Sequence, residues 1–168
     1  MDTFMEKIVE RKKTSKDTLI SAGIVFLCVF LIVFIIPMIP YVNTMQLVFD
    51  VAVIYGAYYL IKSKSIEFEY SVTNGEIDID KIIARSRRKR IFSGNCKEFE
   101  ILARLKGDHY NDSIKNISNK IEAASSMDSP DVFFLVTTYK GQRTVVYFEP
   151  NERMLNAFRL FIPSKIFK

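Results

Sequence analysis

Residues 66–80 read IEFEYSVTNGEIDID, and this stretch decides the class of fold. Apolar and polar side chains alternate on both sides of Asn74-Gly75, which is the period-two pattern of half-buried β-strands. Asn-Gly between two such segments is the strongest short signal for a β-hairpin, because both residues tolerate positive φ angles. The stretch therefore predicts two antiparallel strands joined by a tight turn.

More strands are expected after this hairpin. The alternation slips at residues 81–83, which indicates a β-bulge, and strands are expected next at 87–93 and 96–102. Residues 104–130 are rich in Asn, Ser and Asp. Three interpretations stay open for that segment: a loop, a short helix, or a short strand near residues 119–125.

The C-terminal part again has strand patterns and then a helix. Residues 132–139 read VFFLVTTY, apolar on both faces at the start, and residues 143–148 form a returning strand. Asn151 is expected to cap a final amphipathic helix. Residues 65–168 are therefore predicted to form an α+β domain. Its antiparallel strands would make a partly open barrel or sandwich that ends in a helix.

The N-terminal part has the composition of a membrane protein. Residues 18–61 contain one charged side chain, Asp50, which rules out an ordinary soluble domain and a disordered chain. Residues 18–38 and 43–61 are each long enough to cross a hydrocarbon core of about 30 Å as a helix. The first run far exceeds the core of a signal peptide, which is about 7–15 residues long. The sequence predicts a transmembrane helical hairpin.

Basic residues predict the orientation of this hairpin. Residues 1–17 carry five bases, Lys62 and Lys64 follow the second span, and the loop between the spans has no base. Basic residues stay on the cytoplasmic side of membrane spans. We therefore expect a multi-pass protein of the plasma (inner) membrane with both termini cytoplasmic. Residues 1–17 would be a basic cytoplasmic N-terminus.

Three polar side chains share one stripe of the second span: Asn43, Gln46 and Asp50. An acid at this depth is costly if it is ionised and faces lipid. In one interpretation, Asp50 is a proton or ion site or a buried contact between copies. In the other, it is a protonated carboxyl bonded to the neighbouring helix, or the span is shifted so that Asp50 lies nearer the outer surface.

Residues 81–90 read KIIARSRRKR and form the most basic segment of the chain. An extended chain would project Arg85, Arg87 and Lys89 to one side, and Arg88 and Arg90 to the other. Anionic headgroups attract bases next to a membrane, so this segment is a candidate lipid or partner site. A merely solvated surface is the alternative, and nucleic acid is disfavoured because no aromatic residues are interleaved for stacking. The candidate residues are Lys81, Arg85, Arg87, Arg88, Lys89 and Arg90.

Motifs for catalysis and metal binding are absent from the sequence. The chain has one histidine, His109, and two cysteines, Cys28 and Cys96. These numbers exclude a disulfide framework and a cysteine-rich zinc site. There is no phosphate-binding glycine loop, no G-x-S-x-G and no H-E-x-x-H. We expect no catalytic residues, no metal and no cofactor, and therefore a protein that is not an enzyme.

Two segments resemble a known family: EYSVTNGEIDIDKII at residues 69–83 and KGQRTVVYFEPNERML at residues 140–155. They look like small bacterial membrane proteins of unknown function. Those proteins combine two transmembrane helices with a bacterial PH-like domain. The resemblance covers most of residues 66–161. It implies a PH-like fold and no catalytic residue.

Two functional hypotheses follow. In the first, the chain is a membrane-anchored binding or scaffold module that docks on anionic lipid headgroups or on another membrane protein. Exposed strand edges would also accept a peptide. In the second, the hairpins form a homo-oligomer that acts as a small transport or channel component, with Asp50 at the interface.

Overall fold

The computed structural model describes residues 4–40 and 45–167. The chain divides into two compact units, which are described separately. The first unit contains the residues up to Arg11 together with those from Ile66 onward. The second unit contains residues 12–65.

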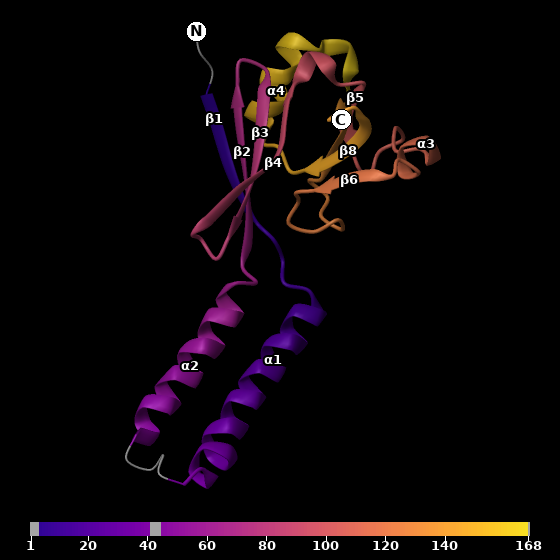
Figure 1. Ribbon diagram of the computed structural model, residues 1–168. Helices are drawn as coiled ribbons and strands as arrows, with labels where there is room; N and C mark the ends of the chain where they lie inside the picture. Colours follow the sequence, from indigo (N-terminus) through magenta and orange to yellow (C-terminus); the bar gives the residue numbers. More distant parts are fainter. Residues whose placement is uncertain (1–3, 41–44, 168) are drawn as a thin grey trace. The chain divides into compact units, whose positions relative to one another are not determined.

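The first unit has two β-sheets and a C-terminal helix (Figure 1). The first sheet is antiparallel, in the order β1 (Phe4–Glu10), β2 (Ile66–Thr73), β3 (Glu76–Ile83), β4 (Arg87–Asn95). The second is in the order β6 (Asn119–Glu122), β8 (Gln142–Phe148), β7 (Phe133–Tyr139), β5 (Ile101–Arg104), β9 (Ile166–Phe167). Its three central strands are antiparallel, while β6 and β9 are parallel to their neighbours. Within the described residues the strands form two separate sheets and no closed barrel.

The hairpin predicted at Asn74-Gly75 is confirmed. Thr73 pairs with Glu76, and Asn74 and Gly75 have φ angles of 51° and 84°. Glycine is required here for a second reason. A Cβ atom on Gly75 would lie 2.9 Å from the Sγ atom of Cys96, closer than real Cβ contacts.

One hydrophobic core joins the two sheets and α4 (Glu152–Phe161). Alternation along β2 and β3 turns one apolar face of the first sheet inward, as expected for half-buried strands. The predicted cap of α4 is confirmed, because the Asn151 side chain accepts a hydrogen bond of 2.8 Å from the Met154 amide. Core residues contributed by the three parts include Tyr70, Ile79, Leu135, Phe148 and Phe158.

Polar contacts also tie the sheets together at Glu149. The fully buried Tyr70 hydroxyl donates to the Ala123 carbonyl and accepts from the Glu149 amide. The Lys7 ammonium of β1 donates to the Glu149 carbonyl over 2.9 Å. The Glu149 carboxylate accepts from the Ser125 hydroxyl over 2.7 Å. Buried polar groups are costly unless they are paired, and these bonds pair them.

The segment between β5 and β7 covers the second face of the second sheet. It contains a short helix, α3 (Asp112–Lys115), and the strand β6, so two of the interpretations left open for it apply. Ile114 and Ile117 pack there with Phe134 and Val145. This cover explains why VFFLVTTY is apolar on both faces.

Two expectations for the middle of the domain were wrong. The strand expected at 96–102 begins only at Ile101, because Cys96–Glu98 (η4) is a 3₁₀ turn that leads from one sheet to the other. The Cys96 amide donates to the Gly75 carbonyl, which directs the chain into this turn. The bulge lies between Ile79 and Asp80 rather than at 81–83.

The strand β1 was not expected, because residues 1–17 were predicted to be a basic cytoplasmic N-terminus outside the domain. In the structure Phe4–Glu10 pairs with β2 along its full length, from Phe4 opposite Thr73 to Glu10 opposite Glu67. The Arg11 amide donates to the Ile66 carbonyl over 2.9 Å. Residues 12–65 are therefore inserted into the loop of a β-hairpin.

The second unit contains two helices that lie side by side (Figure 1). The first consists of α1 (Ser15–Phe30), the π-turn η1 (Leu31–Ile35) and the 3₁₀ turn η2 (Ile36–Met38). Thr14 and Asp17 form a capping box at its start. The segment Ser15–Met38, of 24 residues, is long and apolar enough to cross a membrane by length and composition. The second helix, α2 (Gln46–Lys62), has 17 residues.

The two helices contact each other through one stripe on each. Half-buried residues recur every three or four positions, including Ser21, Ile24 and Cys28 on α1 and Val53 and Ala57 on α2. This is the spacing of one helix face. The remaining apolar surface of both helices is exposed, as at Phe26 and Leu47.

Replacing residues 12–65 with Asn-Gly is expected to give a soluble, folded domain. The hydrogen bond from the Arg11 amide to the Ile66 carbonyl follows directly after the last ladder pair, and a two-residue Asn-Gly loop joins such strands. Circular dichroism and thermal unfolding check this. Residues 66–168 alone are the control: they lack β1 and should unfold at a lower temperature, since burial of Val9 alone contributes about 2 kcal/mol. Equal stability of the two proteins would contradict the assignment of β1 to the core.

Candidate functional site

The candidate site is the segment 81–90, which we call the basic hairpin. It consists of the end of β3, a turn at residues 84–86 and the start of β4. Ile83 pairs with Arg87, while Ala84 and Arg85 both have positive φ angles, 55° and 56°. This turn aims Arg85 differently from a residue in a regular strand.

Three arginines of the basic hairpin are held by carboxylates on the outward side of the first sheet. Strand alternation puts several acids on this side, which we call the acidic face. Arg85 lies 2.7 Å from the Glu67 carboxylate and 2.8 Å from that of Glu10. The acids of this face are Glu6, Glu10, Glu67, Glu69, Glu76, Asp78 and Asp80.

The other two arginines make equally short contacts. The Arg88 guanidinium lies 2.6 Å from the Glu69 carboxylate. Arg90 bridges two acids of β3, at 2.6 Å from Asp80 and 2.8 Å from Asp78. Acids and bases of the first sheet therefore pair with each other on this face.

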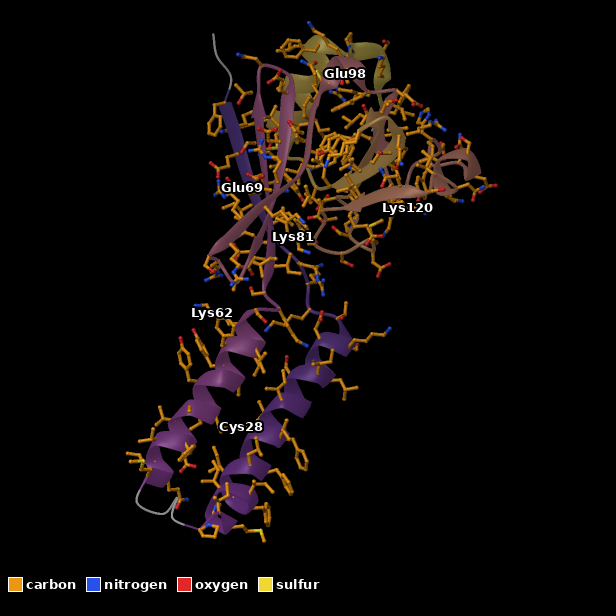
Figure 2. The ribbon with its side chains drawn as sticks, in the orientation of Figure 1. Cys28, Lys62, Glu69, Lys81, Glu98 and Lys120 are labelled. Carbon is orange, nitrogen blue, oxygen red and sulfur yellow. The ribbon has the colours of Figure 1, made fainter. Side chains whose placement is uncertain are left out.

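The other three bases lie on the opposite side of the first sheet. We call this side the core face, because farther along the same strands it packs into the hydrophobic core. Lys81 is directly opposite Lys89 in the β3–β4 ladder, and Arg87 is two residues from Lys89 on the same side. Arg87 and Lys89 are exposed, and Lys81 is half-buried. Within residues 4–40 and 45–167, no acid forms an ion pair with them. Figure 2 labels Lys81 and Glu69 on the first sheet.

This geometry corrects the predicted division of the bases. Arg85 was expected on the same side as Arg87 and Lys89. It instead contacts the acidic face, with Arg88 and Arg90. The cause is the left-handed turn at Ala84-Arg85, which breaks the simple alternation.

Glu69 is an unusual carboxyl, because it is only 4% exposed although it lies on the outward side of the sheet. Burial raises the pKa of Glu69, and a hydrogen bond with the Glu6 side chain raises it further. The positive charge of Arg88 opposes this shift. Ionised Glu69 thus depends on Arg88, whose side chain remains 59% exposed.

The polar stripe of the second span is found in part. Gln46 and Asp50 lie on the half-buried face of α2, in line with Val53 and Ala57. The Oδ1 atom of Asp50 is enclosed and has no hydrogen-bond partner among the described residues. Asn43 lies outside the described residues.

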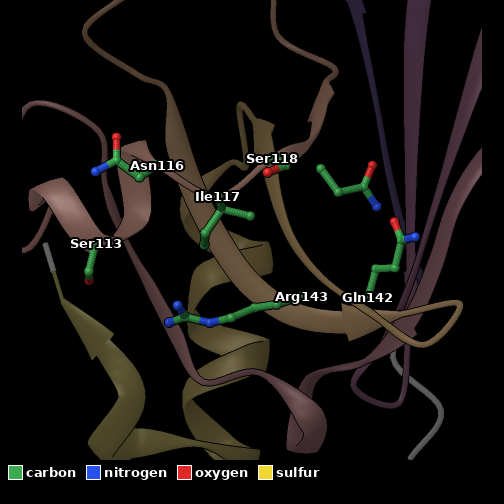
Figure 3. Close-up of a pocket in the computed structure, with 7 residues that line it drawn as sticks. Ser113, Asn116, Ile117, Ser118, Gln142 and Arg143 are labelled. Carbon is green, nitrogen blue, oxygen red and sulfur yellow. The ribbon is translucent and has the colours of Figure 1, made fainter.

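One pocket lies away from the basic hairpin, beside α3 and the start of β8 (Figure 3). It has a volume of about 510 Å³. Its cation, Arg143, already contacts the Glu100 carboxylate at 2.8 Å. No sequence motif marks this surface, because its lining residues come from two separate segments of the chain. They are Ser113, Asn116, Ile117, Ser118, Asn119, Gln142 and Arg143.

Cysteine and metal chemistry have little support in this geometry. Cys96 is fully buried, and burial raises the pKa of its thiol, which keeps it protonated. Cys28 lies half-buried on α1. Among the described residues, no group of three or more His, Cys, Asp or Glu side chains is placed to hold a metal ion.

Comparison with models of known families gives one match, which covers residues 1–168 and is described as "Bacterial PH-like domain (DUF6106)". No curated protein and no solved structure matches the chain. The expected resemblance to a bacterial PH-like domain is thereby confirmed. The two transmembrane helices that it implied stay a prediction.

Glu69→Gln is expected to stabilise the protein at neutral pH but not in acid. A pKa raised by folding means that the folded state holds the proton more tightly than the unfolded state. Ionisation of Glu69 therefore costs stability as the pH rises above the ordinary glutamate range. Thermal unfolding at several pH values should show a difference that is near zero in acid and grows toward neutral pH. A less stable variant at neutral pH would mean that the Arg88 ion pair outweighs burial.

Proposed function

The chain belongs to the bacterial PH-like domain family, and from this premise we propose that it is a membrane-anchored binding or scaffold module rather than an enzyme. The PH-like unit would supply the binding surface, and residues 12–65 would supply the anchor. The observation that carries this proposal is the pairing of β1 with β2 on either side of the helices.

That pairing constrains any membrane topology. Residues 4–10 and 66–73 are neighbours in one sheet, so both must lie in the same compartment. The chain between them then crosses a membrane an even number of times. If Ser15–Met38 makes one crossing, α2 is the helix available for the return.

The surfaces of the helices support an anchoring role. Outside the stripes through which the two helices contact each other, the apolar side chains of both helices are exposed. Exposing so much apolar surface to water would be unfavourable. The 17 residues of α2 extend about 25 Å, at the lower end of what a bilayer core needs. Lipid is the solvent that suits both helices.

Charge supports a cytoplasmic domain. Lys12 and Lys13 precede the first helix and Lys16 lies in its first turn, while Lys62 is the last residue of the second helix and Lys64 follows it. By the positive-inside rule, this distribution supports cytoplasmic termini in a protein of the plasma (inner) membrane. The basic hairpin, in this arrangement, would meet anionic headgroups or the acidic surface of another membrane protein.

A second candidate is an oligomeric transport or channel component. The observation that favours it is the enclosed Oδ1 atom of Asp50, which has no hydrogen-bond partner among the described residues. Ionisable groups within membrane spans often mark ion or proton pathways. In this hypothesis Asp50 lies at a contact between copies.

Labelling of single cysteines by a membrane-impermeant maleimide tests the topology. In a Cys28→Ala background, Ile39→Cys should react from outside intact cells, whereas Ser86→Cys and Lys120→Cys should react only after the cells are opened. Cys96 should not react because it is buried. Reaction of Ile39→Cys and Ser86→Cys from the same side would contradict two crossings.

Asp50→Asn separates the two candidate functions. A transport role predicts proton or ion flux across reconstituted vesicles that this substitution abolishes. If the protein is a binding module, vesicles with wild type and vesicles with Asp50→Asn should both show the same flux as vesicles without protein. We expect this result. Val53→Ala, on the same stripe, is the control. Flux that is lost in Asp50→Asn and kept in Val53→Ala would favour the channel.

A further inference from the structure

We propose that anionic lipid headgroups bind one face of the basic hairpin only, through Lys81, Arg87 and Lys89. The other three bases, Arg85, Arg88 and Arg90, hold the hairpin to its own sheet. This inference rests on the proposed function, because it assumes that the domain is anchored to a membrane.

The acidic face is a poor surface for a phosphate headgroup. Each of its arginines already has a carboxylate within 2.8 Å. A headgroup would have to displace these pairs and leave Glu69 or Asp80 buried without a counter-charge, which is costly. The surrounding acids, which outnumber the arginines, would also repel an anionic membrane.

The core face has the opposite character. None of the four strands places an acid on it, since Met5, Lys7 and Val9 face this way from β1, and apolar residues do so from β2. Lys81 and Lys89 are directly opposite each other, and like charges in this position repel. An external anion between them would relieve that repulsion. Arg87 adds a planar guanidinium that can grip a phosphate with two hydrogen bonds.

Apolar side chains flank these bases. Ile66 and Ile83 are opposite each other at the end of the β2–β3 ladder, both half-buried, and Ile83 is also opposite Arg87. Bases beside apolar residues suit the boundary between headgroups and acyl chains. A free phosphate in solution would use the bases but not the isoleucines, so the surface fits a lipid headgroup best.

The experiment uses the full chain, reconstituted into vesicles of phosphatidylcholine alone or mixed with phosphatidylglycerol. A fluorophore on Ser86→Cys, in the exposed turn, reports distance to acceptor-labelled headgroups by energy transfer, with Cys28→Ala in the background. Wild type should show greater transfer in the anionic vesicles, falling to the neutral level in high salt, where screening is strong.

Three triple variants each remove three positive charges. The first, Lys81→Gln/Arg87→Gln/Lys89→Gln, should lose the extra transfer in anionic vesicles. The second, Arg85→Gln/Arg88→Gln/Arg90→Gln, and the third, Lys106→Gln/Lys115→Gln/Lys120→Gln, should keep it. Thermal unfolding of every variant confirms that the fold is retained, and the third variant replaces the second as control if the hairpin of the second is loosened.

The outcomes are distinct. Equal loss in all three variants would mean a diffuse charge effect and would overturn the inference, as would loss in the arginine variant alone. No difference between neutral and anionic vesicles for wild type would also overturn it. None of these results would contradict the proposed membrane anchor, because the cysteine labelling tests the anchor independently. If inorganic phosphate competed for the site as well as phosphatidylglycerol vesicles do, the site would be one for free phosphate. That result would overturn a lipid site.

Discussion

The antiparallel ladder between β1 and β2 is the interaction on which the rest of the structure depends. Seven residue pairs join the two strands, although residues 11–65 separate them in the sequence. The ladder buries Val9 in the core and brings Lys7 to the Glu149 carbonyl. It also supplies Glu10, one of the two carboxylates that hold Arg85. The edge strand β1 therefore leads into the helices, contributes to the core and supplies an ion-pair partner of the basic hairpin.

The first sheet also separates charge by side. Because successive side chains on a strand point in opposite directions, acids at every second position of β1, β2 and β3 gather on one face. Three arginines are drawn to that face, and the other bases of the hairpin remain without a counter-charge among the described residues. Ion pairs that are partly exposed add little stability each, but several together hold the hairpin in one orientation. The unpaired bases are thus presented by a rigid support rather than by a mobile loop.

The sequence predicted the local elements well, because their signals lie within a few residues. Asn74-Gly75 marks a turn by its φ angles, Asn151 marks a helix start by its side chain, and VFFLVTTY marks a doubly covered strand. β1 was missed because its partner lies beyond two helices. The side of the sheet on which Arg85 lies was predicted wrongly, because it depends on a left-handed turn. The contact of Arg88 with Glu69 depends on the register of three strands, which the sequence does not show. Charge alone was enough to locate the basic hairpin in the sequence. It was not enough to predict which side of the hairpin carries the bases without an ion-pair partner among the described residues.

Insertion of the helices into a β-hairpin has a consequence for biosynthesis. β1 is translated first and its partner only after both helices. With the proposed membrane anchor, β1 would therefore remain on the ribosome-facing side while the helices enter the bilayer. A chain in which one helix failed to cross would leave β1 and β2 on opposite sides of the membrane. The sheet would then lack its edge strand, and the backbone of β2 would stay open to proteases. In the proposed anchor, the sheet would therefore be complete only in chains whose two helices have both crossed the membrane.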